Sequence, residues 1–118
     1  MATEEELPAL AARRDRWRAE HLRSLADRPA TNGGGIHHAA LICADVERTI
    51  AFYQGLLGFP LVELVENRDY PGSTHLFFDV GNRTLLGFFD FPGLGLEQGV
   101  EAIGGVQHIA IHVERSRW

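Results

Sequence analysis

The stretch HHAALICADVERTIAFYQGLLGF, residues 37–59, decides the fold because it joins a strand to a helix. Together with Ile36, its first part is an apolar run of strand length that reaches Cys43. Asp45 then stands where a helix N-cap is expected. Apolar residues follow at helical spacing: Val46, Ile50, Tyr53 and Leu57. Gly58 can adopt the left-handed conformation that ends many helices, so the stretch predicts a strand, a helix and a glycine stop.

Three further strands are expected after this helix. LVELVE at 61–66 has the composition of a strand, and NRDYPGS after it is a loop by its Pro, Gly and Asn content. Two more apolar runs, 75–80 and 83–89, flank Gly81 and Asn82, a pair typical of a tight hairpin turn. The predicted order is therefore strand, helix, strand, strand, strand.

A histidine occupies the third position of two similar runs, IHHAALIC at 36–43 and VQHIAIHV at 106–113. Alternate residues of a strand share a face, so His38 and His108 would each lie beside a small alanine. A recurring unit indicates pseudo-symmetric modules, whose first strands can bring both imidazoles to one cavity. Neutral imidazole binds Fe, Mn, Ni and Zn ions, so the repeat favours a metal site. Structural histidines bonded to the backbone stay an alternative.

Composition and charge narrow the class of protein. The chain has 118 residues, of which 45% are hydrophobic, and this suits one domain with a modest core. Its net charge of -5 argues against nucleic acid or an anionic membrane as a partner. No apolar run approaches the roughly 18 residues of a membrane span, and the acidic N-terminus has no signal core. With Cys43 as its one cysteine the chain forms no internal disulfide, so we expect a cytoplasmic protein.

Three segments are expected along the chain. Residues 1–34 are predicted to form a helix over 4–27, with glutamates near its start where the helix dipole favours them, and then a glycine-rich linker. Residues 35–91 form the first module. Residues 92–118 contain a glycine-rich connection and the first strand of a truncated second module.

The stretch 37–59, with its Asp cap and its FY…LLGF ending, resembles the opening strand and helix of the vicinal oxygen chelate superfamily. That superfamily includes glyoxalases, extradiol ring-cleaving dioxygenases, and fosfomycin and bleomycin resistance proteins. The resemblance covers about residues 36–113 and implies an α+β fold: a βαβββ module plus the first strand of an incomplete second module. It also implies a divalent metal ion held by His38 and His108, and a small substrate that chelates this ion through vicinal oxygens.

Departures from the family pattern bear on the ligand set. Glyoxalase-type members take a Glu from the last strand of the first module, where this sequence has Gly87, and Asp90 falls on the other face. Extradiol-type members take their Glu from the second module, so a dioxygenase-like two-His-one-carboxylate site is favoured. Ring-cleaving members place an acid/base His where Arg83 stands, and arginine does not exchange protons at neutral pH. A glyoxalase-like lyase or isomerase and a non-catalytic drug-binding protein stay open as alternatives.

The second module is unfinished in this sequence, and an unfinished sheet leaves an open edge. We expect either an inactive fragment of a longer protein or a homodimer in which a second copy completes the second sheet. Four further side chains are candidates for contact with the small-molecule substrate: His75, Phe77, Arg83 and His112. His75 and Phe77 share one strand face, and His112 shares the face of His108.

Overall fold

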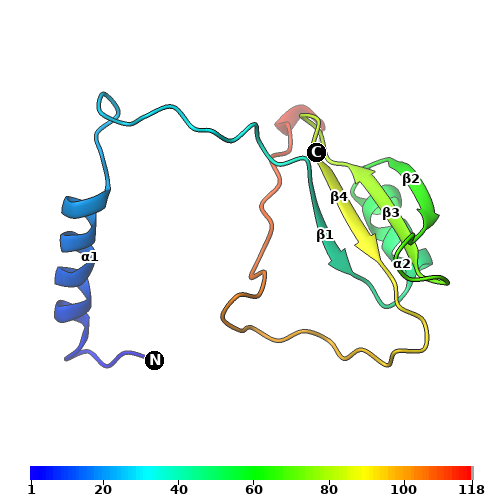
Figure 1. The fold of residues 1–118 in the computed structure, drawn as a ribbon, viewed down its shortest axis with the longest axis horizontal. Coiled ribbons are helices and arrows are strands. Elements are labelled where there is room, and N and C mark those ends of the chain that lie inside the picture. The colour runs from blue at the N-terminus through cyan, green and yellow to red at the C-terminus, as the bar shows by residue number, and fades with distance from the viewer. Residues whose placement is uncertain (118) are drawn as a thin grey trace. The chain divides into compact units, whose positions relative to one another are not determined.

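Figure 1 shows the fold in a computed structural model that describes residues 1–117. The chain divides into two compact units, one formed by residues 1–34 and the other by the chain from Gly35 onwards. The first unit contains helix α1 (Leu7–His21), which is shorter than the predicted 4–27. None of its residues is buried, and a helix without a packed apolar face has little to extend it. No helix within the described residues combines the length and the hydropathy that crossing a membrane requires.

The second unit is built on a mixed four-stranded sheet with the strand order β1-β4-β3-β2. Its strands are β1 (His38–Ile42), β2 (Leu61–Glu66), β3 (Thr74–Asp79) and β4 (Leu85–Phe89). β1 pairs with β4 in parallel, and the other two pairings are antiparallel. β1 and β2 therefore run in the same direction, which requires a crossover connection between them. The predicted βαβββ order and α+β fold class are confirmed.

The crossover from β1 to β2 consists of helix α2 (Val46–Ile50) and the π-helical segment η1 (Ala51–Leu56). The backbone N–H of Arg48 donates a hydrogen bond of 3.0 Å to Asp45 Oδ1, so the predicted N-cap is confirmed. Gly58 has a φ angle of 74°, which confirms the predicted left-handed stop. The change from α-helical to π-helical hydrogen bonding was not predicted, because π-helical turns are rare and the sequence carries no signal specific to them.

The core lies between α2 and one face of the sheet, which we call the helix face. Four side chains from the two central strands are buried there: Leu76, Phe78, Leu86 and Phe88. Partly buried residues of β1 and of the crossover pack against them, including Ala39, Leu41, Ile50 and Tyr53. The central strands supply the buried residues because they are covered by a neighbouring strand on each side.

The opposite face of the sheet, which we call the open face, is formed by the residues that alternate with the core residues. Its members include His38 and Ala40 on β1, Gly87 and Phe89 on β4, His75 and Phe77 on β3, and Glu63 and Val65 on β2. Phe77 lies opposite Gly87 in the antiparallel register, and Gly87 lies opposite Ala40 in the parallel one. Small residues therefore occupy two neighbouring positions beside Phe77, and they leave room for its ring.

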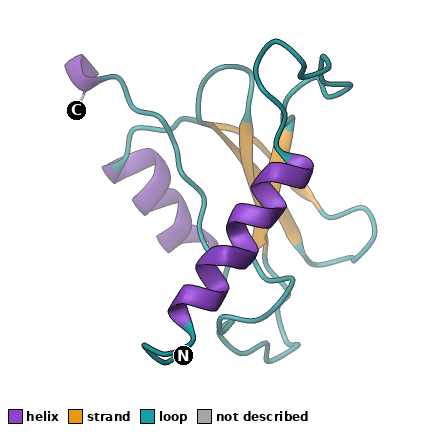
Figure 2. Cartoon of the chain, turned by 90° about the vertical axis from the view of Figure 1, so that its left-hand side faces the viewer, coloured by secondary structure: helices purple, strands orange, loops and turns teal. Residues whose placement is uncertain are grey.

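Residues 106–113 form no strand within the described chain, where Figure 2 draws the C-terminal segment as a loop. The first strand of a second module therefore stays a prediction. Within residues 1–117, the backbone of this segment makes no hydrogen bond to other backbone groups. A strand exists only through pairing with a neighbour, and the apolar pattern alone does not supply one. Ile111 packs against the core, while the other residues of the segment are exposed.

The β3–β4 hairpin turns through three residues rather than the predicted two: Gly81, Asn82 and Arg83. The backbone N–H of Val80 donates to the carbonyl oxygen of Thr84 at 3.1 Å and closes the turn. The three turn residues have φ angles of 95°, 51° and 61° in chain order. As a result, β4 begins at Leu85 rather than at the predicted residue 83.

Replacing Arg83 by glycine is expected to stabilise the second unit. A left-handed conformation costs a residue with a side chain about 1 to 2 kcal/mol, and Arg83→Gly removes this cost. Part of the resulting gain in stability is lost, because glycine also makes the unfolded chain more flexible. The net gain should be about 0.5 to 1 kcal/mol, measured by thermal unfolding. Asn82→Gly is the matched control and should gain less, because asparagine tolerates this conformation. A melting temperature below that of the parent chain for Arg83→Gly would contradict this account of the turn.

Candidate ligand site on the open face of the sheet

His38 is the first residue of β1 and lies on the open face with its side chain exposed. Its Nδ1 atom is 2.9 Å from Nδ1 of His37, so one of the two rings donates a proton to the other. When His38 is the donor, its Nε2 keeps a lone pair for a ligand or a metal ion. Strand alternation would place His37 on the other face. The contact forms because His37 precedes the regular strand, and the sequence pattern gave no signal of it.

The ring of Phe77 covers the place where a side chain at position 87 would lie. A Cβ atom built on Gly87 would be 2.9 Å from Cε1 and 3.1 Å from Cδ1 of that ring. The same ring meets the His38 imidazole edge to face, with centroids 5.5 Å apart and an interplanar angle of 88°. The absence of a carboxylate at Gly87 therefore has a packing reason, because Phe77 occupies the space that it would need.

His75 lies on the central strand β3, between two phenylalanine rings of the open face. Its imidazole stacks on Phe89 with centroids 3.7 Å apart and an angle of 23°. The centroid of Phe77 lies 4.2 Å from it on the neighbouring position. The Nε2 atom of His75 is buried and has no hydrogen-bond partner within the described part of the chain. Buried polar atoms in proteins normally form a hydrogen bond, so the unpaired Nε2 of this imidazole is an exception.

Burial lowers the pKa of His75 below its ordinary value, and the nearby His38 lowers it further. Glu63, which the register places on the open face of β2, acts in the opposite direction but is the smaller influence. An ordinary histidine has a pKa of about 6.5, so His75 is neutral at pH 7. His75 at pH 7 is therefore a neutral imidazole in which one ring nitrogen is a hydrogen-bond donor and the other an acceptor.

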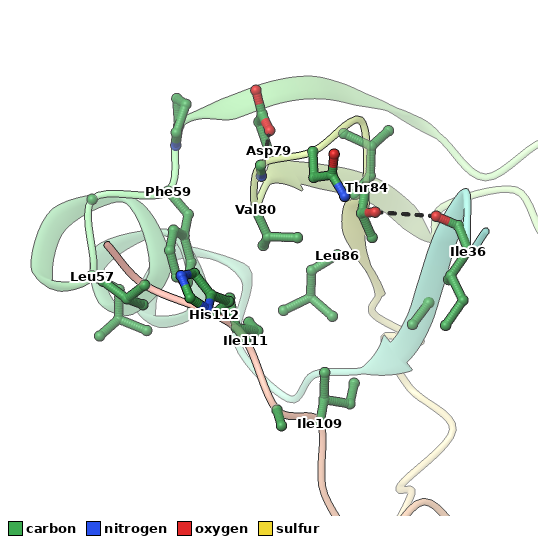
Figure 3. Close-up of a pocket in the computed structure, with 18 of the residues that line it drawn as sticks. Ile36, Leu57, Phe59, Asp79, Val80, Thr84, Leu86, Ile109, Ile111 and His112 are labelled. Atoms are coloured by element: carbon green, nitrogen blue, oxygen red, sulfur yellow. Dashed lines mark hydrogen bonds between the residues drawn. The ribbon is translucent and has the colours of Figure 1, made fainter. Parts of the chain in front are cut away.

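The C-terminal segment borders a different surface, a hollow of about 1190 Å³ (Figure 3). Ala39 and Leu86, whose side chains point to the helix face, line it together with Ile111. His108 and His112 also line this hollow, whereas His38 does not. Nδ1 of His108 contacts the side-chain oxygen of the residue before it, and His112 lies 3.6 Å from the carboxylate two positions later in the chain.

The structure thus separates the candidate residues into two groups. His38, His75 and Phe77 meet on the open face, while His108 and His112 line the hollow. Arg83, the remaining candidate, is exposed on the hairpin turn. Across residues 1–117, no group of three or more His, Cys, Asp or Glu side chains is arranged to hold a metal ion. The single chain does not bring His38 and His108 to one cavity, and their role as metal ligands stays a prediction.

Comparison with protein families gives one match over most of the second unit. The family model described as the Glyoxalase/Bleomycin resistance protein/Dioxygenase superfamily matches residues 35–115. This range contains the four strands, the crossover and the C-terminal segment that lines the hollow.

Two similar proteins of Bacillus subtilis strain 168 are named as ring-cleaving dioxygenases. MhqO is 40% identical over 77 residues, which are 61% of this chain and 23% of that protein. MhqA is 36% identical over 76 residues, which are 61% of this chain and 24% of that protein. Human mitochondrial methylmalonyl-CoA epimerase is 34% identical over 88 residues, covering 70% of this chain and 48% of the epimerase. The chain thus spans about a quarter of the length of the two dioxygenase-named relatives.

Proposed function

The chain belongs to the glyoxalase, bleomycin resistance protein and dioxygenase superfamily, and on this premise we propose that it binds a small molecule with vicinal oxygens on the open face of its sheet. We propose that this binding is part of a divalent-metal enzyme with a dioxygenase-like ligand set. The observation that supports it most directly is the exposed imidazole of His38, held in place on the open face by His37 and Phe77.

The described residues fit part of a metal site and not a complete one. His38 offers Nε2 because its Nδ1 is engaged by His37, and His108 offers Nε2 because its Nδ1 contacts Gln107. Within residues 1–117 no third ligand joins either of them. When bound, an Fe, Mn, Ni or Zn ion would act as a Lewis acid and as a template for the substrate.

In this proposal His38 is the first imidazole ligand, His108 is the second, and the carboxylate comes from outside residues 1–117. A second copy of the chain could bring its His108 to the open face of the first. A dioxygenase-like set is favoured over a glyoxalase-like one because Phe77 covers Gly87, where a first-module carboxylate would project. The names of two relatives, as ring-cleaving dioxygenases, agree with that choice.

A second candidate function is the binding of a small molecule without any metal. It is favoured by the same packing of Phe77 over Gly87, which fills the open face with aromatic rings instead of ligands. Aromatic rings contribute contact area and stacking to a bound organic molecule and need no ion to do so. The two candidates differ in whether the exposed imidazole of His38 binds a divalent ion.

Titration with Zn²⁺ alone tests the metal proposal. Zn²⁺ is a suitable probe because imidazole nitrogen is one of its preferred ligands. We expect the parent chain to bind the ion and His38→Ala to bind it at least about tenfold more weakly, since the substitution removes one imidazole nitrogen that coordinates the ion. Isothermal titration calorimetry at pH 7 measures the affinity. His21→Ala is the matched control, because His21 is an exposed histidine on α1.

A mixture of two variants tests whether a second copy completes the site. If the site is formed by His38 of one chain and His108 of another, His38→Ala and His108→Ala each bind Zn²⁺ weakly alone. In their mixture, His38 of one variant can meet His108 of the other, so part of the Zn²⁺ binding is recovered. Equal zinc affinity of the parent, His38→Ala and the His21→Ala control would rule out the metal proposal. Binding of a small aromatic molecule by the same samples would then favour the metal-free candidate.

A further inference from the structure

We propose that helix α1 pairs in antiparallel orientation with the α1 helix of a second copy of this chain. The inference goes beyond the proposed ligand function and does not depend on it. It concerns the first compact unit, residues 1–34, which lies outside the range 35–115 that matches the superfamily. The superfamily match therefore assigns no role to α1.

The first observation is that the apolar side chains of α1 are largely uncovered. Leu7 is 52% exposed and Trp17 is 45% exposed, and no residue of the helix is buried. α1 has 15 residues, and an isolated helix of about that length is only marginally stable in water. Packing against a partner helix would therefore stabilise α1 and remove the exposed tryptophan from water.

The second observation is the spacing of the residues on this side of α1. They recur at alternating intervals of three and four, the pattern of a helix side that faces another helix: Leu7, Leu10, Arg14, Trp17 and His21. In an antiparallel pair, Leu7 of each chain would face Trp17 of the other, and the aliphatic part of Arg14 would cover Leu10. In a parallel pair, Arg14 would face Arg14, and these like charges repel each other.

The third observation is the distribution of charge along the first unit. Residues 1–12 contain three glutamates and no arginine, so their side chains carry a net charge of -3. Residues 13–28 contain six arginines and three acidic residues, a net charge of +3. An antiparallel pair places the acidic start of each helix beside the arginines of the other, whereas a parallel pair places like charges together. The charge pattern therefore fits a second copy of the same helix.

The acidic start of the unit has carboxylates available for such a partner. Within the described residues, no ion pair involves Glu4, Glu5 or Glu6, whereas Arg18 and Asp15 of α1 form one of 2.7 Å. Exposed ion pairs contribute little to affinity, so the charges would mainly set the orientation of the two helices. The contact area would come from the leucines and the tryptophan, and we expect a weak dimer that depends on salt.

Sedimentation equilibrium of the whole chain tests the pairing. We expect a monomer–dimer equilibrium that shifts toward the monomer as NaCl is added, because salt screens the attraction between the helices. Trp17→Ala should weaken the dimer at least about tenfold, since an aromatic ring supplies much of the contact area. Leu25→Ala is the matched control, because Leu25 is an exposed apolar residue of the same unit outside α1 and should leave the equilibrium unchanged.

Disulfide formation between two variants tests the orientation. Both carry Cys43→Ala, so that each chain has only its introduced cysteine. Chains with Thr3→Cys should form a disulfide with chains that carry His21→Cys, because antiparallel pairing brings these two positions together. Chains with Thr3→Cys alone should form far less, since their cysteines meet only in a parallel pair.

Each outcome has a defined meaning. A chain that is monomeric at every concentration would overturn the proposal, and a monomer that Trp17→Ala destabilises would show that α1 packs on its own chain instead. A dimer that Trp17→Ala leaves unchanged would form through another surface, which also overturns the proposal. A preference of Thr3→Cys chains for one another would overturn the antiparallel orientation.

Discussion

Phe78→Ala should lower the free energy of unfolding of the second unit by about 3 to 5 kcal/mol, the usual cost of truncating a fully buried phenylalanine. Phe78 is 0% exposed and lies on the central strand β3. Its ring packs against Tyr53 and Phe88, with centroids 5.4 Å and 5.9 Å away. The core has few buried residues to share the loss, so we expect the variant to be largely unfolded at 37 °C.

Thermal and urea unfolding followed by circular dichroism would measure this effect. Phe52→Ala is the matched control, because the Phe52 side chain is 46% exposed and contacts the same Tyr53. Its cost should be below about 1 kcal/mol, as for most substitutions of exposed residues. Similar losses in the two variants would mean that the core does not lie on the helix face as described.

Gly87→Ala should destabilise the second unit by about 1 to 3 kcal/mol, because the added methyl group overpacks the open face. The new Cβ would lie 2.9 Å from Cε1 of Phe77 and 3.4 Å from the carbonyl oxygen of Ala39. The ring of Phe77 must then move, and its contacts with His38 and His75 change with it. We expect the NMR resonances of both imidazoles to shift in this variant.

A double-mutant cycle with Phe77→Ala tests the cause. Without the ring, the methyl group at position 87 meets only ordinary contacts, so Gly87→Ala should be neutral or stabilising in that background. Gly55→Ala is the control, because nothing lies within 4 Å of its added Cβ and its helical position favours alanine. An equal cost of Gly87→Ala with and without Phe77 would show that the clash with the ring is not the cause.

The sequence by itself predicted the elements whose causes are local. Asp45 caps the helix that follows it through a bond to a residue three positions away, and Gly58 ends the crossover through its own φ angle. The strand at 61–66 is found where its composition predicts it. Such features need only neighbouring residues, so they are written in short stretches of sequence.

Tertiary structure alone decided which side chains meet. The run 106–113 has the pattern of a strand, yet it forms none because no edge pairs with it in the described chain. The packing of Phe77 over Gly87 depends on the register of β3 against β4, and the unpaired nitrogen of His75 depends on both neighbouring strands. Strand pairing and side-chain packing join residues distant in sequence, and for that physical reason no local pattern could predict them.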